Sequence, residues 1–190
     1  MKILCCQVSI EGVVTRSDME VHQGRLSRLI SAACKHNDFE LVVLPELSAI
    51  EYSEAAFNNL SELSTPIDGW LCSSMADLAV ETNTPICFGM PRRDGDNHHI
   101  SQVIIGSDGA LIGYYDKLHI AQFGNAVEKP YFTLGKHICV FDIGGFRFGL
   151  VICYDMRFGD YVSKIAREHD LDVMLHPVAF SADGSFASWR

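Results

Sequence analysis

Runs of apolar and β-branched residues, separated by polar or glycine-containing segments, recur along the chain and predict a series of buried strands. Three other stretches, 18–36, 70–82 and about 159–169, place apolar residues at helical spacing and predict helices. The strands are expected at 1–10, 39–46, 85–90, 100–106, 111–115, 138–143, 146–152 and 172–175. Strands mixed with helices in this order indicate an α/β domain with helices packed outside a sheet.

The first predicted helix, 18–36, has Ser17 or Asp18 available as an N-cap. The apolar residues expected to face the core are Val21, Leu26, Leu29, Ile30 and Ala33.

Glycine-containing turns connect the later strands. Ser107-Asp108-Gly109 and Gly144-Gly145 predict two hairpins, the second of which ends at Cys153. Residues 91–97 are expected to form a polar turn, and residues 118–136 irregular surface loops.

The composition excludes several classes of function. A chain of 190 residues, 48% hydrophobic and 21% charged, is expected to form one globular domain over 1–190. The formal net charge is -9 and the basic residues are scattered, so no nucleic acid partner is expected. No apolar run approaches the roughly 20 residues that span a bilayer, so no membrane partner is expected either.

The cysteines and histidines do not predict a metal site. The seven cysteines are an odd number, lie mostly in apolar runs and follow no signal-peptide core, which favours a reducing, cytoplasmic compartment. The pairs Cys5-Cys6 and His98-His99 do not suit zinc, because neighbouring side chains on a strand point to opposite faces. We therefore expect no metal.

Three polar residues follow apolar strands: Glu46, Lys117 and Cys153. Strand ends at one edge of a sheet converge, so the three side chains are expected to form one cluster. In such a cluster a carboxylate takes the thiol proton and returns it to a leaving amine, and the thiolate acts as nucleophile. An ammonium stabilises the oxyanion, beside the backbone N–H of Tyr154, the residue after the nucleophile.

Other interpretations of the same residues stay open. Cys153 alone is compatible with an inert core cysteine, and Glu46 and Lys117 with solvated loop residues. His119, close to Lys117, is the main rival for the base, in a Cys-His arrangement. A different class of function is a catalytically silent binding or assembly module.

Three strings resemble the signature motifs of the nitrilase, or carbon–nitrogen hydrolase, superfamily, in the family's order. They are LPEL at 44–47, YDKLHI at 115–120 and GLVICYDMRF at 149–158. The resemblance implies a catalytic triad of Glu46, Lys117 and Cys153 that hydrolyses a small amide substrate through an acyl-enzyme and releases ammonia and a carboxylic acid. It also implies a four-layer α-β-β-α sandwich that forms a homodimer or higher homo-oligomer, and no cofactor.

The resemblance extends to two further side chains. The family has a glutamate between its lysine and cysteine motifs, followed by an aromatic residue and a glycine, and EKPYFTLG at 128–135 matches this pattern. Glu128 is therefore expected to orient Lys117 and the substrate amine. Arg157, four residues after the nucleophile, presents a planar fork of donors that suits a substrate carboxylate, or else pairs with Asp155 or Asp160.

The chain departs from the family pattern in two places. Gly159-Asp160 stands where members often have Pro-Glu. The resemblance also continues to the last residues, where Ser188-Trp189-Arg190 resembles the start of a helix, so the chain is expected to be the N-terminal portion of the family domain. YDMRF most resembles amidases that act on small linear ω-amides; N-carbamoyl amino-acid amidohydrolases and nitrilases use the same triad.

Overall fold

The computed structural model describes residues 1–123 and 126–179. Its strands form a five-stranded sheet in the order β1-β2-β3-β4-β5, a three-stranded sheet in the order β10-β9-β8, and the pair β6-β7. The strands are β1 (Ile3–Cys5), β2 (Leu41–Val43), β3 (Ile86–Asp94), β4 (Asn97–Ile105), β5 (Leu111–Asp116), β6 (Gln122–Phe123), β7 (Ala126–Val127), β8 (Cys139–Ile143), β9 (Phe146–Leu150) and β10 (Val173–Leu175). The helices are α1 (Arg16–Cys34), α2 (Glu54–Phe57), α3 (Leu60–Leu63), α4 (Trp70–Thr82), the 3₁₀ helix η1 (Cys153–Arg157) and α5 (Gly159–Glu168).

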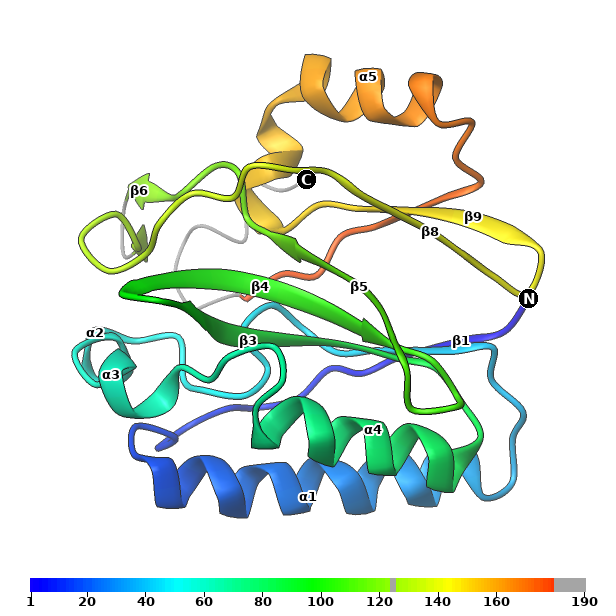
Figure 1. Cartoon of the computed structure of the whole chain (residues 1–190), viewed down its shortest axis with the longest axis horizontal. Coiled ribbons are helices and arrows are strands. Elements are labelled where there is room, and N and C mark those ends of the chain that lie inside the picture. Colours follow the sequence, from blue (N-terminus) through cyan, green and yellow to red (C-terminus); the bar gives the residue numbers. More distant parts are fainter. Residues whose placement is uncertain (124–125, 180–190) are drawn as a thin grey trace.

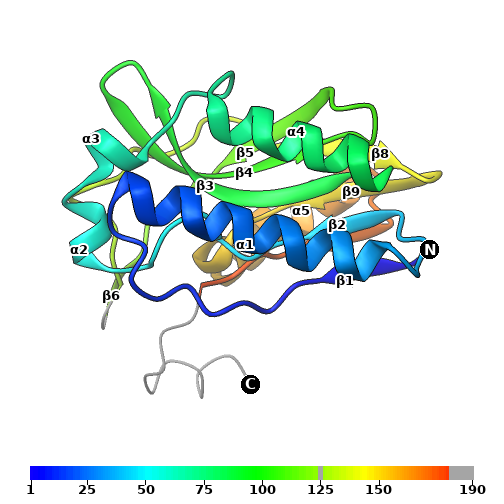
Figure 2. The same ribbon diagram turned by 90° about the horizontal axis from the view of Figure 1, so that it is seen from below.

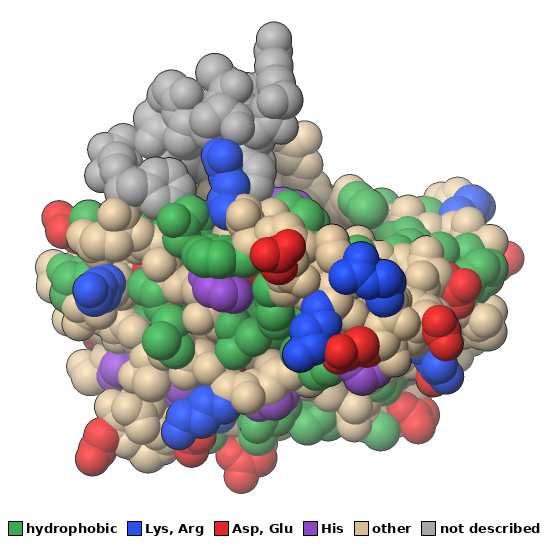
Figure 3. Space-filling model, turned by 90° about the horizontal axis from the view of Figure 1, so that it is seen from above, with side chains coloured by type: hydrophobic (Ala, Val, Ile, Leu, Met, Phe, Trp, Pro, Cys, Tyr) green, Lys and Arg blue, Asp and Glu red, His purple; other side chains and the backbone are tan. Residues whose placement is uncertain are grey.

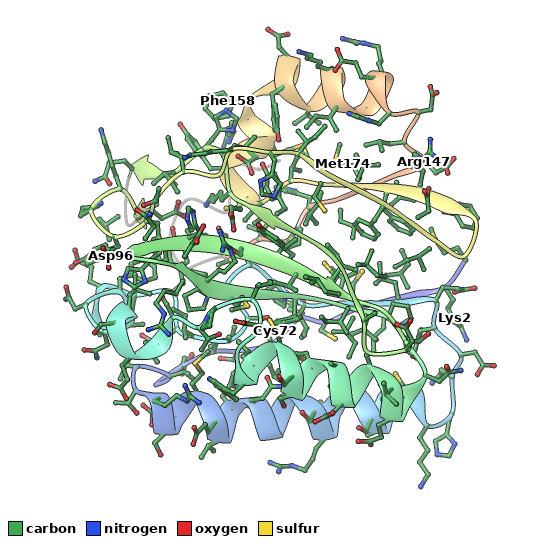
Figure 4. All side chains as sticks on the ribbon, viewed as in Figure 1. Lys2, Cys72, Asp96, Arg147, Phe158 and Met174 are labelled. Atoms are coloured by element: carbon green, nitrogen blue, oxygen red, sulfur yellow. The ribbon has the colours of Figure 1, made fainter. Side chains whose placement is uncertain are left out.

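The elements are stacked in layers. Helices α1 and α4 lie side by side on one face of the five-stranded sheet, the three-stranded sheet lies on its other face, and α5 covers the outside (Figures 1 and 2). Side chains fill the space between the layers, and the buried Cys72 of α4 lies on the side that faces the sheet (Figure 4). The prediction of an α/β domain with outer helices is confirmed, and most of its strands belong to two separate sheets.

The bounds and the buried face of α1 differ from the prediction. Its N-cap is Thr15, whose hydroxyl accepts from the backbone N–H of Asp18 while the Asp18 carboxylate accepts from the Thr15 N–H. Val21 and Leu29, expected in the core, are 71% and 51% exposed. Leu26 and Ile30 are buried as predicted, together with Met19, His22 and Gln23.

The strand β3 continues through the segment predicted as a polar turn. It runs to Asp94, and the turn is confined to residues 95 and 96. Arg92 is buried in this strand because its guanidinium forms two hydrogen bonds with Asp116 of β5, at 2.9 and 2.7 Å. The predicted helix 70–82 has the bounds of α4, whereas the short helices α2 and α3 were not predicted.

The surface agrees with the scattered charges of the sequence. On the face that carries α5, basic and acidic side chains are interspersed (Figure 3). Within 1–123 and 126–179, no helix has the length and apolar character needed to cross a membrane. The helix expected at Ser188-Trp189-Arg190 lies outside the described residues.

Candidate active site

Lys117 is the centre of a buried charged cluster. It follows the last residue of β5, and its side chain is completely buried. Its Nζ donates to Glu46 Oε1 at 2.7 Å and to Glu128 Oε1 at 2.7 Å. The structure therefore brings together one ammonium and two carboxylates without direct solvent contact, where electrostatic interactions are much stronger than in water.

Glu46 is held from several directions. It lies three residues beyond the end of β2, and its Oε2 accepts from the backbone N–H of Ala179 at 2.9 Å. Its backbone passes so close to Gly89 of β3 that a Cβ there would overlap Pro45 and Leu47. Leu47 has a positive φ of 48°, an uncommon conformation for a residue with a branched side chain. Glu46 is therefore placed by a tight turn packed against a neighbouring strand.

Cys153 occupies a strained turn at the end of the three-stranded sheet. It is the first residue of η1 and has a positive φ of 45°, a conformation that is costly for a non-glycine residue and often found at functional sites. Its backbone N–H donates to Pro177 O at 3.0 Å, and its carbonyl accepts from His176 Nε2 at 2.9 Å. Unlike its three charged neighbours, Cys153 is only half-buried, so a substrate can reach it.

Burial and the neighbouring Glu46 carboxylate raise the pKa of the Cys153 thiol and keep it protonated at rest. Burial raises its pKa, and so do the charge of Glu46 and a hydrogen bond with Glu46, whereas Lys117 acts in the opposite direction. Burial alone would lower the pKa of Lys117, but Glu46 and Glu128 outweigh this effect and raise it. The cluster thus combines a neutral thiol, a neighbouring carboxylate that can accept its proton, and a permanent cation.

Glu128 connects the cluster to the loop after β7. Its Oε1 also accepts from the hydroxyl of Tyr52 at 2.6 Å, and its Oε2 accepts from the backbone N–H of Ala121 at 2.8 Å. Burial raises the pKa of Glu128, Lys117 opposes this effect, and Glu46 adds to it. Tyr52, six residues after Glu46, was not identified from the sequence, where only that short spacing could have indicated it.

His119, the rival base, lies against Asp155. Its Nδ1 is 2.7 Å from Asp155 Oδ1, and its ring stacks on Phe158 with centroids 3.7 Å apart. Phe158 itself lies at the start of α5 (Figure 4). The imidazole thus contacts a carboxylate of η1, the turn that begins with Cys153. From the sequence, Asp155 was expected only as a possible ion-pair partner of Arg157.

Tyr154 and Arg157 both belong to η1, the turn that begins with the cysteine. Tyr154 is half-buried, and its ring makes an edge contact with Phe158 at 5.4 Å. Arg157 is exposed at the end of the turn. In the part of the chain that the structure describes, no group of three or more His, Cys, Asp or Glu side chains has the geometry to hold a metal ion.

The sequence comparisons identify the family of this chain. The family profile of the carbon–nitrogen hydrolases matches residues 2–185. A protein named nitrilase from Pyrococcus abyssi is 32% identical over 155 residues, which cover 80% of this chain and 56% of that protein. The human omega-amidase NIT2 is 28% identical over 157 residues, which cover 80% of this chain and 55% of that protein. The chain therefore spans little more than half of the length of these relatives.

The structural comparisons show the same fold in solved proteins. Nit3 of Saccharomyces cerevisiae, described as a member of branch 10 of the nitrilase superfamily, superposes with a TM-score of 0.80 at 27% identity, covering 97% of this chain and 67% of that one. An amidase from Nesterenkonia sp. AN1, in which acrylamide is attached to the active-site cysteine, superposes with a TM-score of 0.82 at 19% identity, covering 98% and 70%. At that identity the second likeness concerns the fold alone.

Proposed function

Because this chain belongs to the carbon–nitrogen hydrolase family, we propose that it hydrolyses a non-peptide carbon–nitrogen bond of a small amide through a cysteine acyl-enzyme. The products are ammonia and a carboxylic acid. The observation that carries the proposal is the buried cluster in which Lys117 bridges Glu46 and Glu128, with Glu46 near enough to Cys153 to raise the pKa of its thiol.

The first half of the reaction forms the acyl-enzyme. Glu46 takes the proton of the thiol as Cys153 Sγ attacks the amide carbon, so the proton leaves only when the nucleophile is needed. The negative charge that develops on the carbonyl oxygen is stabilised by the Lys117 ammonium and the backbone N–H of Tyr154. Glu46 then returns its proton to the leaving nitrogen, the carbon–nitrogen bond breaks, and ammonia departs from a thioester.

The second half releases the acid. Glu46 takes a proton from a water molecule that attacks the thioester carbon, and the same oxyanion donors stabilise the second tetrahedral intermediate. The carbon–sulfur bond breaks, the carboxylic acid leaves, and the thiol of Cys153 is protonated again. Glu128 orients Lys117 and the substrate amine, and Tyr52 in turn orients Glu128 through their 2.6 Å hydrogen bond.

The substrate class is inferred from Arg157 and from the similarity to omega-amidases. A guanidinium at the end of the nucleophile turn suits a substrate that carries a carboxylate a few bonds from its amide. The proposal therefore names small linear ω-amides, and the same triad would serve an N-carbamoyl amino acid or a nitrile. We also infer the family-type four-layer α-β-β-α sandwich for the whole protein and its association into a homodimer or higher homo-oligomer.

The covalent intermediate provides the test. Rapid acid quench of the protein with a four-carbon dicarboxylic acid monoamide, followed by intact-mass measurement, is expected to show an acyl adduct. Cys153→Ala should show neither adduct nor turnover, whereas Cys5→Ala, which removes an exposed cysteine, should behave as the unchanged protein. A panel with the N-carbamoyl compound and the nitrile identifies the preferred class. Equal turnover with and without Cys153 would contradict the mechanism, and lack of turnover on the whole panel would favour a binding module.

A further inference from the structure

Asp155 is a buried carboxylate that the proposed reaction does not use. It lies in η1, two residues after Cys153, and its side chain is completely buried. Its Oδ1 accepts from the backbone N–H of His119 at 2.8 Å and pairs with His119 Nδ1 at 2.7 Å. Its Oδ2 accepts from the Tyr115 hydroxyl at 2.8 Å and from the Ile152 backbone N–H at 3.0 Å.

These donors come from the two segments that carry the reacting groups. Tyr115 and His119 lie two residues before and two residues after Lys117, on the five-stranded sheet side of the site. Ile152 immediately precedes Cys153, at the end of the three-stranded sheet. A single carboxylate therefore connects the segment of the ammonium to the turn of the nucleophile, across the boundary between the two sheets.

The contacts of Asp155 require a side chain that only accepts hydrogen bonds. All four partners approach Asp155 as donors, and an ionised carboxylate has enough lone pairs for all of them. An amide of the same shape has one oxygen, so its NH₂ group would face either the Ile152 N–H or the His119 N–H, each of which is itself a donor. Asparagine at this position would thus break the connection to the nucleophile turn or to the lysine segment without changing the volume of the side chain.

We propose that Asp155 is a positioning residue that fixes the Lys117 ammonium relative to the Cys153 thiol. The proposal rests on the proposed function, because Lys117 must meet the oxyanion that forms when Cys153 attacks. A displacement of about 1 Å between reacting groups can cost on the order of 100-fold in rate. A carboxylate that only caps η1 would affect stability and leave the chemical step unchanged.

The kinetic test compares Asp155→Asn with Asp142→Asn in the full chain. Asp142 lies on β8 in an exposed ion pair with Arg147, so its amide variant controls for the loss of a surface charge. With the dicarboxylic acid monoamide, Asp155→Asn should lower kcat about 100-fold, with KM within about threefold of the unchanged protein. A folded Asp155→Asn protein whose kcat equals that of Asp142→Asn would overturn the proposal.

A second measurement keeps this test separate from the proposed function. Lys117 favours the thiolate of Cys153, so its displacement should slow alkylation of Cys153 by iodoacetamide relative to the exposed Cys5 in the same chain. A rate ratio in Asp155→Asn equal to or above that of the unchanged protein overturns the proposal, even if no amide is turned over. If Asp155→Asn does not fold, Tyr115→Phe decides: it removes one donor, and kcat should fall about fivefold with KM unchanged. Unchanged values of kcat and of the alkylation ratio in Tyr115→Phe overturn the proposal.

Discussion

Glu46 and Lys117 are 71 positions apart in the sequence, and their buried side chains meet in a 2.7 Å hydrogen bond. The same ammonium contacts Glu128, so the cluster holds two potential negative charges and one positive charge. The two ends of the Glu46–Lys117 pair are therefore not equivalent. Removal of the lysine leaves two carboxylates facing each other, whereas removal of the Glu46 charge leaves a complete pair.

This asymmetry predicts different losses of stability. Lys117→Met should lower the free energy of unfolding by about 3–5 kcal/mol, because it leaves buried carboxylates without a counterion. Glu46→Gln should cost only about 1–2 kcal/mol, because Lys117 keeps Glu128. Both variants should lose at least about 100-fold in kcat/KM. Urea unfolding and initial rates check the prediction, and equal stability losses would contradict it.

Replacement of His119 should have a mild effect. His119→Ala removes the ring contact with Asp155 but keeps the backbone N–H that donates to the same oxygen. We expect a loss of less than about tenfold in kcat/KM. A loss as large as that of Glu46→Gln, measured with the same substrate, would instead support a Cys-His mechanism.

Gly89→Ala should disturb the placement of Glu46. The new methyl group would overlap the backbone of Pro45 and Leu47, so the turn must move. We expect a loss of stability of about 1–3 kcal/mol from overpacking, together with lower activity. Gly24→Ala in α1 is the matched control, since its Cβ would meet only the end of Arg28 at 3.8 Å, and a helical alanine should stabilise by about 0.5–1 kcal/mol. Thermal unfolding measures both variants, and midpoints that shift in the same direction would contradict this assignment.

Arg157→Lys should weaken discrimination between acid and ester substrates. A lysine keeps the charge but lacks the fork that binds a carboxylate through two hydrogen bonds. The ratio of kcat/KM for an ω-amide acid to that for its methyl ester should fall by about tenfold. The same ratio in both proteins would show that Arg157 does not recognise the carboxylate.

Asp116 should contribute to the acid stability of the fold. Burial raises its pKa, but hydrogen bonds from Arg92 and Ser101 and the charge of Arg92 outweigh burial, so the pKa lies below its ordinary value. The ion pair therefore stabilises the protein above about pH 4, and this contribution disappears as the pH falls through the lowered pKa. Asp116→Asn should cost about 3 kcal/mol at neutral pH and much less near pH 2. Urea unfolding at both pH values checks this, and a constant difference would contradict it.

The sequence pattern was sufficient to predict those helices and strands whose structure follows from their own residues. The helix at 70–82 was found with its observed bounds, since an apolar helical repeat there follows Gly69 and ends before Pro85. The strands before Glu46 and Cys153 were also recognised, because continuous apolar runs are typical of buried strands. These elements place the motif residues at strand ends, as expected.

The other features depend on contacts between distant segments. The sequence predicts Arg92 in a polar turn, because its partner Asp116 is distant in the chain. A four-residue helix such as α2 or α3 is too short to show a helical period of apolar residues. The buried face of α1 includes His22, whose ring is 3.0 Å from the Ser48 carbonyl, a contact that no apolar pattern can indicate. Tyr52 and Asp155 are recognised only when their partners in space are known.

The bond between Ala179 and Glu46 has a consequence for the order of folding. It joins residues 133 positions apart, so it closes a far longer loop than the hairpin contacts of β3 with β4. Such distant contacts bear a large loop-closure entropy and tend to form slowly. During synthesis the ribosome must also have released residue 179 before this amide can reach Glu46. The five-stranded sheet can therefore assemble while Glu46 still lacks one of its donors, and the proposed site is completed after this sheet.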